Sequence, residues 1–353
     1  MKKQALFVAL GVAITTSAAG AAGTAQTYKV FIFAGQSNAQ GKAPNSMFDA
    51  QAEDPRTREL YKHMRKDGKW IVRDDVLCWY KARKGGLTVG YGSPGRSGAE
   101  LEFGWMMGDR FEEPVVIIKT CQGGMSLFMN FRPPSSGMPT EEVLKAHRER
   151  MQGAAKARKE PVPTAAECDQ KWGEWYRFIL SDYKTVVESW EKEFPVLKGR
   201  TPTLAGFVWF QGWNDQYGAE KEYEGHLKNL IKDVRKDLNA PNLPFVIVAM
   251  GQNGSSPATG ALLTIREAQM AMNDVREFKG NVKAFRSDLL VDKDAERLST
   301  EKDPVMRERN QEELKKYAAD EAYHYYGSPI WYMRIGHAAG EAMLELLGKQ
   351  GGR

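Results

Sequence analysis

Four short apolar runs, separated by stretches with helical spacing, constrain the fold of this chain most strongly. The runs are rich in β-branched and aromatic residues and are each followed by Gly or polar residues, which is typical of buried strands. They cover residues 28–34, 114–119, 205–210 and 244–250, and a further strand is expected at 282–285. Strands that alternate with helices form a mostly parallel sheet with helices on both faces. We therefore expect an α/β fold, a three-layer α/β/α sandwich.

Apolar residues at helical spacing predict the covering helices. In one segment Tyr223, Leu227 and Leu230 fall on one helical face. The predicted helices cover residues 141–156, 172–193, 222–238, 261–275 and 331–347. Two other stretches, at about 42–97 and 130–168, are polar, irregular and interrupted by Gly and Pro. We interpret both as insertions at the edge of one domain, which covers residues 26–353.

The N-terminus has the three regions of a secretory signal peptide in order. Lys2 and Lys3 precede an apolar run over residues 5–14, and small residues follow over 17–25. The run is shorter than the ~20 apolar residues that a bilayer-spanning helix needs. We expect residues 1–25 to be a signal peptide and the mature protein to be periplasmic or secreted, without stable membrane insertion. The alternative is an apolar N-terminus of a soluble protein.

Composition argues against several classes of partner. The formal net charge of +5 is spread along the chain, and no Lys/Arg run with interleaved aromatics suggests a nucleic-acid surface. The three cysteines (Cys78, Cys121 and Cys168) are an odd number and lack the spacing of a zinc site. We expect no metal and no cofactor, and we leave one disulfide open. Cys121 ends an apolar run, which favours a packed thiol over a nucleophile.

Three of the four strong strands end in a polar motif that contains Gly. These motifs are GQSN at residues 35–38, CQGG at 121–124 and QGWND at 211–215. Ligands of parallel α/β sheets bind beyond the carboxyl ends of the strands. The fold therefore brings the three motifs together at one edge of the sheet, where we expect the functional site.

Ser37 is the candidate nucleophile at this edge. It follows a strand and Gly35, a position from which a hydroxyl projects over the sheet. The alternative is a helix N-cap, which is a frequent role of Ser after a strand. The motif also differs from the G-x-S-x-G elbow, because Ala39 replaces its second Gly.

The other two motifs offer donors for a developing oxyanion. Gly123 and Gly124 allow a backbone N–H to face the substrate, and the Asn214 amide is a further donor. The alternatives are a strand-ending turn and an Asx-turn.

His324 is the candidate base among the five histidines of the chain. His63 and His147 lie in charged segments that we expect to be solvated, and His226 and His337 lie in predicted helices with surface positions expected. His324 alone lies in an aromatic loop punctuated by Gly, and imidazole is suited to proton transfer near neutral pH.

A carboxylate is expected to orient the base. Glu321 lies three residues before His324 and Asp320 lies four residues before it. Both also fit solvated charges at a helix end, so the sequence leaves the acid open.

With these residues in place, the chain resembles the SGNH-hydrolase superfamily, and within it the sialate O-acetylesterase and carbohydrate esterase family 6 group. That group typically opens with GQSN, which residues 35–38 match. Its strand-plus-Gly-Gly block matches residues 117–124, its W-x-QG block matches 209–212, and its C-terminal His block matches His324. The resemblance spans about residues 28–347, with the four blocks in order.

The resemblance implies a flavodoxin-like sheet and roles for individual residues. Ser37 is the implied nucleophile and His324 the base. The Ser37 N–H, a Gly123 or Gly124 N–H and the Asn214 side chain form the implied oxyanion hole.

Two departures from the group's pattern affect these assignments. The group often carries Glu and a small residue where this chain has Trp213 and Asn214, which leaves open a share of the oxyanion role for Gln211. The usual D-x-x-H is here Glu321-x-x-His324, so a triad and a Ser–His dyad both remain open. We expect Gln36, Gln211 and Trp213 to contact substrate.

The expected reaction is removal of an acetyl group from an acetylated sugar or polysaccharide through an acyl-enzyme. Two alternatives remain: a non-catalytic glycan-binding protein on the same fold, and an esterase for other small acyl esters. The nearby aromatics (Trp209, Trp213, Tyr217, Tyr325 and Tyr326) are candidates for stacking on a sugar, with Trp209 expected in the core. The glycan and the oligomeric state are not predicted.

Overall fold

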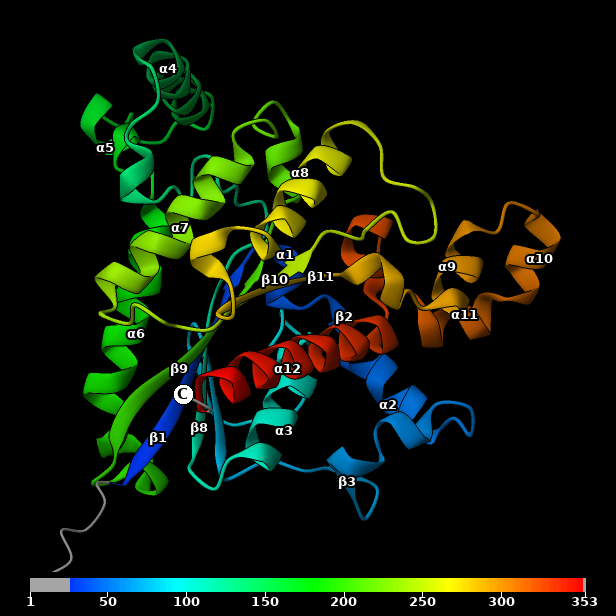
Figure 1. Cartoon of the computed structure of the whole chain (residues 1–353). Helices are drawn as coiled ribbons and strands as arrows, with labels where there is room; N and C mark the ends of the chain where they lie inside the picture. The colour runs from blue at the N-terminus through cyan, green and yellow to red at the C-terminus, as the bar shows by residue number, and fades with distance from the viewer. Residues whose placement is uncertain (1–25, 352–353) are drawn as a thin grey trace, which may run out of the picture.

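A computed structural model describes residues 26–351 of the chain. The predicted signal peptide, residues 1–25, lies outside the described residues. A central sheet is enclosed between two layers of helices, and α12, the last helix, runs across one face of the sheet (Figure 1).

The central sheet has seven strands in the order β11-β10-β9-β1-β8-β5-β6. The pairing of β5 with β6 is antiparallel and every other pairing in this sheet is parallel. The strands are β1 (Thr27–Gly35), β5 (Val76–Tyr80), β6 (Arg83–Gly86), β8 (Val115–Cys121), β9 (Thr201–Phe210), β10 (Phe245–Ala249) and β11 (Val282–Arg286). All five predicted strands are therefore confirmed, with boundary shifts of a few residues.

The strand order identifies the topology. Numbered by themselves in chain order, β1, β8, β9, β10 and β11 are arranged 2-1-3-4-5, which is the flavodoxin-like order. The expected three-layer fold is confirmed. The strand order reverses between β1 and β9, and ligands of such sheets bind at this switch point.

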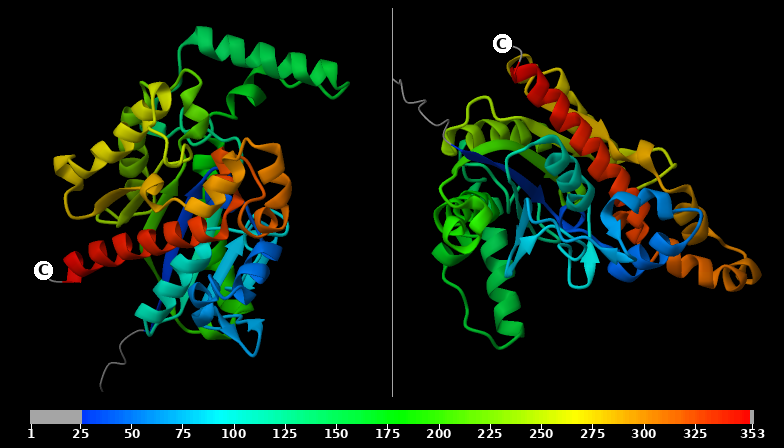
Figure 2. Two further views of the ribbon diagram at one scale, coloured as in Figure 1. Left: turned by 90° about the vertical axis from the view of Figure 1, so that its right-hand side faces the viewer. Right: turned by 90° about the horizontal axis from the view of Figure 1, so that it is seen from below.

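Successive side chains of β1 enter opposite cores, as the period of two along a strand requires. Phe31 and Phe33 pack into the core under α3 (Glu100–Arg110) and α12 (Pro329–Gly351). Ile32 and Ala34 pack into the core under α6 (Glu174–Glu193), α7 (Tyr223–Asp237) and α8 (Gly260–Met270). The two helical layers are seen from further sides in Figure 2.

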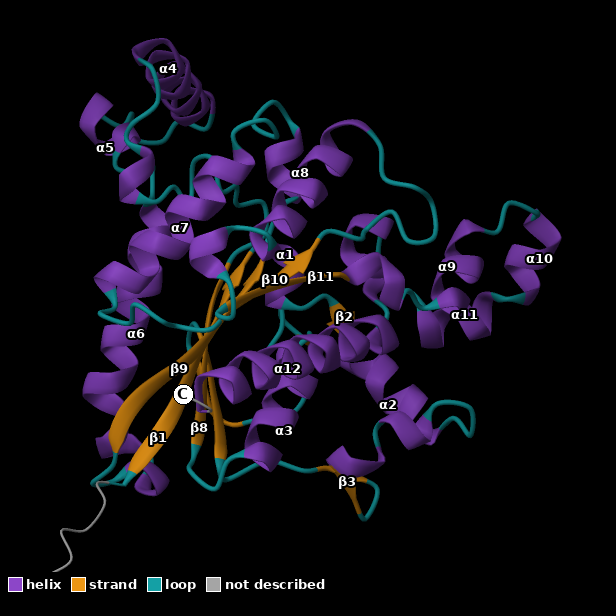
Figure 3. Cartoon of the chain, in the orientation of Figure 1, coloured by secondary structure: helices purple, strands orange, loops and turns teal. Residues whose placement is uncertain are grey.

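The remaining elements lie at the ends and edges of the sandwich (Figure 3). The helices are α1 (Ser37–Gln40), α2 (Asn45–Glu53), α4 (Glu141–Ala157), α5 (Ala165–Asp169), α9 (Lys293–Thr300), α10 (Pro304–Arg309) and α11 (Gln311–Tyr317). Two short ladders pair β2 (Ala43–Pro44) with β7 (Arg96–Ser97) and β3 (Arg65–Lys66) with β4 (Lys69–Trp70). The short 3-10 helices include η5 (Trp213–Gln216) and η9 (Ala322–Gly327).

The two irregular stretches differ in character. Residues 42–97 include β5 and β6, so part of this stretch extends the central sheet instead of only bordering it. Residues 130–168 include α4 and α5, which stand out from the body at the end where the parallel strands finish (Figure 1).

The three cysteines are free and buried. Burial raises the pKa of the Cys121 thiol to about 12, and its Sγ lies 3.1 Å from the carbonyl oxygen of Phe33. Cys121 is therefore a packed thiol. Within residues 26–351 no helix has the length and apolar character needed to cross a bilayer.

Candidate active site

Backbone hydrogen bonds join the ends of the three strands that carry the polar motifs. The Gln36 N–H donates to the Phe210 carbonyl over 3.2 Å, and the Gln122 N–H donates to the Gly35 carbonyl over 3.1 Å. Gly35 has φ of +148°, and a Cβ there would lie 2.1 Å from the Phe210 oxygen. Only glycine fits this junction, which brings the end of β1 against the end of β9.

Ser37 is the first residue of α1 and is 7% exposed. The N-cap position belongs to Gln36, and the helix has no side-chain cap, so Ser37 does not have the capping role considered as its alternative. Among the described residues its hydroxyl has no hydrogen-bond partner. The position of a Cβ built on Gly123 lies 3.6 Å from Ser37 Cβ, which places the Gly123 backbone beside the serine.

Asp320, and not Glu321, contacts the His324 ring. His324 Nδ1 lies 2.9 Å from Asp320 Oδ1. Asp320 Oδ2 lies 2.7 Å from Arg96 Nη1, so the carboxylate bridges imidazole and guanidinium. Glu321 is exposed, and only its backbone takes part in this turn, with its N–H donating to Asp320.

The surroundings of Asp320 keep it ionised. Burial acts to raise its pKa, but hydrogen bonds from His324 and the Glu321 N–H, with the charge of Arg96, hold that pKa below its ordinary value. An ionised carboxylate on Nδ1 fixes the tautomer that leaves Nε2 as the proton acceptor.

Tyr323 and Tyr332 tie the histidine loop to the serine helix. Asn38, the neighbour of Ser37, donates from Nδ2 to the Tyr323 carbonyl over 2.9 Å and accepts from the Tyr332 hydroxyl over 2.6 Å. Tyr325 and Tyr326 follow His324 with φ of 54° and 55°. This left-handed pair turns the chain sharply beside α1, although it costs about 1 kcal/mol or more per residue.

The described residues show no hydrogen bond between Ser37 and His324. In free enzymes such catalytic hydrogen bonds are often long and shorten when substrate binds.

Gln36 orients Asn214. The Gln36 side-chain oxygen accepts from the N–H groups of Gly212 (3.2 Å) and Asn214 (3.3 Å). Its Nε2 therefore faces the Asn214 oxygen, to which it donates over 3.0 Å. Asn214 Nδ2 has no acceptor among the described residues, so a donor remains available at the switch point.

Gln211 is committed to a buried network. Its Nε2 donates to Asp215 Oδ2 over 2.6 Å, to Gln36 Oε1 over 3.2 Å and to the Met125 carbonyl over 3.1 Å. With these three acceptors in place, Gln211 has no hydrogen left for an oxyanion. Through these bonds Gln211 joins Gln36 to Asp215.

Asp215 is a residue to which sequence reasoning assigned no role. It is 1% exposed and accepts the backbone N–H groups of Leu127 (2.9 Å) and Phe128 (2.7 Å) in addition to Gln211. These bonds join the loop after β9 to the loop after β8, which carries Gly123 and Gly124. Gly124 has φ of +77°, the left-handed region that favours glycine.

A buried ion pair contacts the C-terminal end of α1. Lys119 Nζ lies 2.8 Å from Glu100 Oε2 and donates to the Gln40 carbonyl at the end of α1 over 2.8 Å. The Lys119 side chain is 0% exposed. The fixed ammonium holds the carbonyl end of the short helix that begins with Ser37.

The aromatic candidates divide into two groups. Trp209, Tyr325 and Tyr326 are core residues, the first as expected. Trp213 is half-buried, and its ring centroid lies 5.6 Å from that of Tyr323. Tyr323 was not among the aromatic residues predicted to lie near the site. The Tyr323 ring meets the His324 ring edge-on at 4.5 Å, so this pair flanks His324.

The expected solvated positions of two other histidines are wrong. His147 and His226 are 6% and 7% exposed. Each is buried because an aromatic ring packs on it, Trp172 on His147 and Phe128 on His226. His63 and His337 are exposed, as expected. Among the described residues no group of His, Cys, Asp and Glu side chains is arranged to hold a metal ion.

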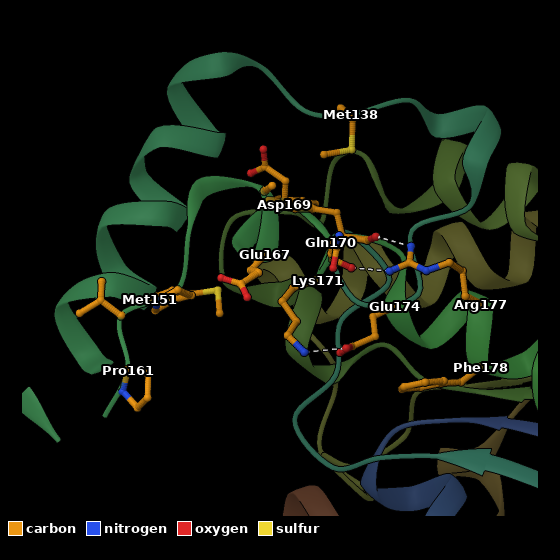
Figure 4. Close-up of a pocket in the computed structure, with 14 residues that line it drawn as sticks. Met138, Met151, Pro161, Glu167, Asp169, Gln170, Lys171, Glu174, Arg177 and Phe178 are labelled. Carbon is orange, nitrogen blue, oxygen red and sulfur yellow. Dashed lines mark hydrogen bonds and ion pairs between the residues drawn. The ribbon is translucent and has the colours of Figure 1, made fainter. Parts of the chain in front are cut away.

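A cavity of about 580 Å³ adjoins the oxyanion side of the site. Gly124 and Asn214 line it together with residues of α4. A larger cavity of about 1060 Å³, shown in Figure 4, is lined by residues from α5, α6 and their surroundings and by none of the predicted site residues. Its charged side chains are paired in part, as Lys171 with Glu174 over 2.6 Å. Of these two cavities, only the smaller one is lined by candidate oxyanion donors, and a further cavity of about 630 Å³ is lined by Asp320 and Glu321.

The comparisons with known proteins agree with the resemblance seen in the motifs. Residues 161–309 match the family "Carbohydrate esterase, sialic acid-specific acetylesterase". The chain thus resembles the carbohydrate esterases, as expected, and the matched segment includes the QGWND motif. Ser37 and His324 lie outside the matched segment.

Individual relatives match the chain over a short segment or at low sequence identity. A probable carbohydrate esterase of Arabidopsis thaliana is 32% identical over 71 residues, which are 20% of this chain and 25% of that protein. A solved structure of an Arabidopsis thaliana protein has a TM-score of 0.42 at 16% identity and covers 73% of this chain and 85% of its own. A carbohydrate acetylesterase from Xanthomonas citri has a TM-score of 0.44 at 14% identity, covering 89% and 55%.

Proposed function

We propose that this protein is a serine carbohydrate esterase that removes O-acetyl groups from an acetylated sugar or polysaccharide. The observation that carries the proposal is the His324–Asp320 pair held beside α1, with Ser37 at its start and the free Asn214 donor across the strand switch point. The match of residues 161–309 to a carbohydrate esterase family supports the substrate class.

In the proposed reaction, Ser37 Oγ attacks the acetyl carbonyl carbon and its proton passes to His324 Nε2. The carbonyl becomes an oxyanion that accepts hydrogen bonds from Asn214 Nδ2 and from backbone N–H groups at Ser37 and Gly123 or Gly124. The bond to the sugar oxygen then breaks, and that oxygen takes the proton from His324.

Water completes the cycle. His324 Nε2 accepts a proton from water as the water oxygen attacks the acetyl-Ser37 carbonyl. The second oxyanion collapses, acetate leaves, and Ser37 Oγ recovers the proton. Asp320 stabilises the charged imidazole in both halves and remains ionised throughout.

Hydrolysis of p-nitrophenyl acetate and p-nitrophenyl butyrate tests the proposal. We expect turnover of acetate, a sharp fall with butyrate, and loss of activity in Ser37→Ala. Ser181→Ala is the matched control, since Ser181 is an exposed serine of α6 whose hydroxyl donates to the Phe178 carbonyl and makes no hydrogen bond to the three motifs. An equal loss in the control, or turnover that rises with acyl length, contradicts the proposal.

The rival reading is a glycan-binding protein without turnover. It predicts sugar binding that survives Ser37→Ala and no acetate release from acetylated polysaccharide by the wild type. Export through the predicted signal peptide is part of the proposal, and N-terminal sequencing of the mature protein from its host checks the cleavage.

A further inference from the structure

The cavity beside the oxyanion donors has a wall that the sheet does not supply. α4 contributes Val143, Ala146, His147 and Arg150, and the loops after β8 and β9 contribute residues from Gly124 to Asn130 and from Asn214 to Tyr217. Its volume of about 580 Å³ lies in the range of small-molecule sites, roughly 300–1,000 Å³. A substrate bound at Ser37 therefore has room to extend toward α4.

The side chains around this cavity are suited to a sugar. Ser126, Asn130 and Asn214 offer polar groups. Phe128 and Trp172 offer rings, and Tyr217 is 73% exposed beside them. No Asp or Glu is among the residues that line it.

Arg150 is the cation of this cavity. Its Nη2 lies 3.1 Å from His147 Nδ1, and among the described residues it has no carboxylate partner. By contrast, Arg148 on the same helix pairs with Glu141 and Asp169 over 2.6 Å each. Arg150 thus keeps its charge uncompensated at the cavity.

His147 does not add a second charge, but it orients Arg150. Its Nε2 lies 3.3 Å from the Cys168 carbonyl, which can only accept, so Nε2 carries the hydrogen and Nδ1 accepts from Arg150. Burial, together with the charge of Arg150, lowers the pKa of His147 below its ordinary value. A neutral His147 acts as a fixed acceptor for the guanidinium.

The wall of this cavity also contains a buried donor without a partner. Trp172 is 5% exposed, and its Nε1 hydrogen has no acceptor among the described residues. Buried donors without a partner are rare in folded proteins. Trp172 lines both this cavity and the larger one of Figure 4, and its Nε1 atom is itself buried.

From these observations we infer that α4 forms a subsite for a sugar unit that carries a carboxylate, with Arg150 as its binding residue. The inference rests on the proposed function for the position of the acetylated unit. A guanidinium binds a carboxylate in a bidentate manner, and the cavity has no negative side chain to oppose it. The favoured substrate is an acetylated acidic oligosaccharide.

Calorimetric binding to the Ser37→Ala protein tests this subsite without turnover. The probes are trigalacturonic acid with its methyl ester, and sialyllactose with lactose, so that each acid has a neutral counterpart. We expect one of the two acids to bind at least about tenfold more tightly than its neutral counterpart, and this preference to fall with added salt. Which acid shows the preference distinguishes a uronic acid from a sialic acid as the ligand.

Three variants test whether Arg150 causes the preference for the acid. Arg150→Gln is expected to weaken binding of the acid about ten- to a hundredfold and Arg150→Lys to weaken it less. Lys145→Gln removes the same charge from α4 at a residue that does not line the cavity, and should leave binding unchanged. A midpoint of thermal unfolding equal to that of the wild type shows that each variant is folded.

The inference is overturned if neither acid is preferred over its neutral counterpart, or if Arg150→Gln keeps the preference. The result is independent of the esterase proposal. Failure of the wild type to hydrolyse p-nitrophenyl acetate refutes the proposed function, whereas the Arg150-dependent preference is measured with no ester to cleave.

Discussion

Asp320 and Glu321 are adjacent in the chain, but only Asp320 reaches the imidazole of His324. The backbone at His324 has φ of −108° and ψ of 27°, which is neither helical nor extended. In this turn the residue four positions earlier, and not three, comes within 2.9 Å of Nδ1. The sequence left the acid open because spacing alone does not specify such a turn.

Substitution of the two acids separates these alternatives. Asp320→Asn is expected to lower kcat by about a hundredfold or more, since the amide does not stabilise the charged imidazole and favours the wrong tautomer. Glu321→Gln, an exposed neighbour with the same change of charge, should stay within about twofold of wild type. Steady-state kinetics on p-nitrophenyl acetate provides the measurement, and a large loss in Glu321→Gln with little loss in Asp320→Asn would reverse the assignment.

The sequence predicted the other site residues to different extents. Ser37, Asn214 and His324 follow from motifs and strand ends. A share of the oxyanion role for Gln211 was left open because the chain departs from the group's pattern at Trp213 and Asn214, and no sequence pattern predicts the three acceptors of its amide. Arg96 lies 224 positions from Asp320 in the chain, and no local sequence pattern predicts their contact.

At the scale of elements, the site depends on two loops that follow different strands. Asp215 in the loop after β9 accepts two backbone N–H groups from the loop after β8. Burial raises the pKa of Asp215 to about 6, although the hydrogen bond from Gln211 and the two from backbone N–H groups act to lower it. The carboxylate that joins the two loops is therefore sensitive to pH.

The sign of this dependence follows from linkage. The pKa is higher in the folded protein than the ordinary value near 3.9 of an unfolded chain, so the folded state binds more protons between about pH 4 and 6. The stability contributed by Asp215 is therefore largest below this window and falls by up to about 3 kcal/mol as the pH rises through it.

Urea unfolding of wild type and Asp215→Asn from pH 4 to 7.5 measures this contribution. We expect the difference in free energy of unfolding, wild type minus variant, to decrease up to about pH 6 and then to level off. Most other titrating groups are common to both proteins and cancel in the difference. A difference that is flat, or that grows with pH, would contradict the assignment.

Helix α4 is the element whose position the sequence did not give. Its amphipathic pattern predicted a helix over residues 141–156, but the placement of a polar insertion depends on a few tertiary contacts. One of these is the pairing of Arg148 with Asp169 from α5, and another is the packing of His147 on Trp172. These contacts bring Arg150 to the wall of the cavity.

At the scale of the whole molecule, the parallel sheet and its switch point were predictable because four of the buried strands are short apolar runs followed by Gly or polar residues. The strands β5 and β6 were not predicted. β5 (Val76–Tyr80) is an inner strand made of five apolar residues, but it lies inside a polar and irregular stretch, and β6 (Arg83–Gly86) contains two charged residues and two glycines. β6 is an edge strand, and short, charged edge strands protect a sheet from aggregation.

The layered fold also explains why the candidate residues converge from sites far apart in sequence. Ser37, Asn214 and His324 follow β1, β9 and α11, and the sheet brings the first two to neighbouring strand ends. The Asn38 side chain then joins the third to them. We propose that this convergence makes Ser37 a nucleophile.

Covalent trapping with a fluorophosphonate tests that claim most directly. The folded wild-type protein is treated with the reagent, digested, and the modified residue is identified by mass spectrometry. We predict one adduct, on Ser37, that is absent in Ser37→Ala, slow to form in His324→Ala and unchanged in Ser181→Ala. An adduct on another residue, or none in a protein that hydrolyses p-nitrophenyl acetate, would contradict the account.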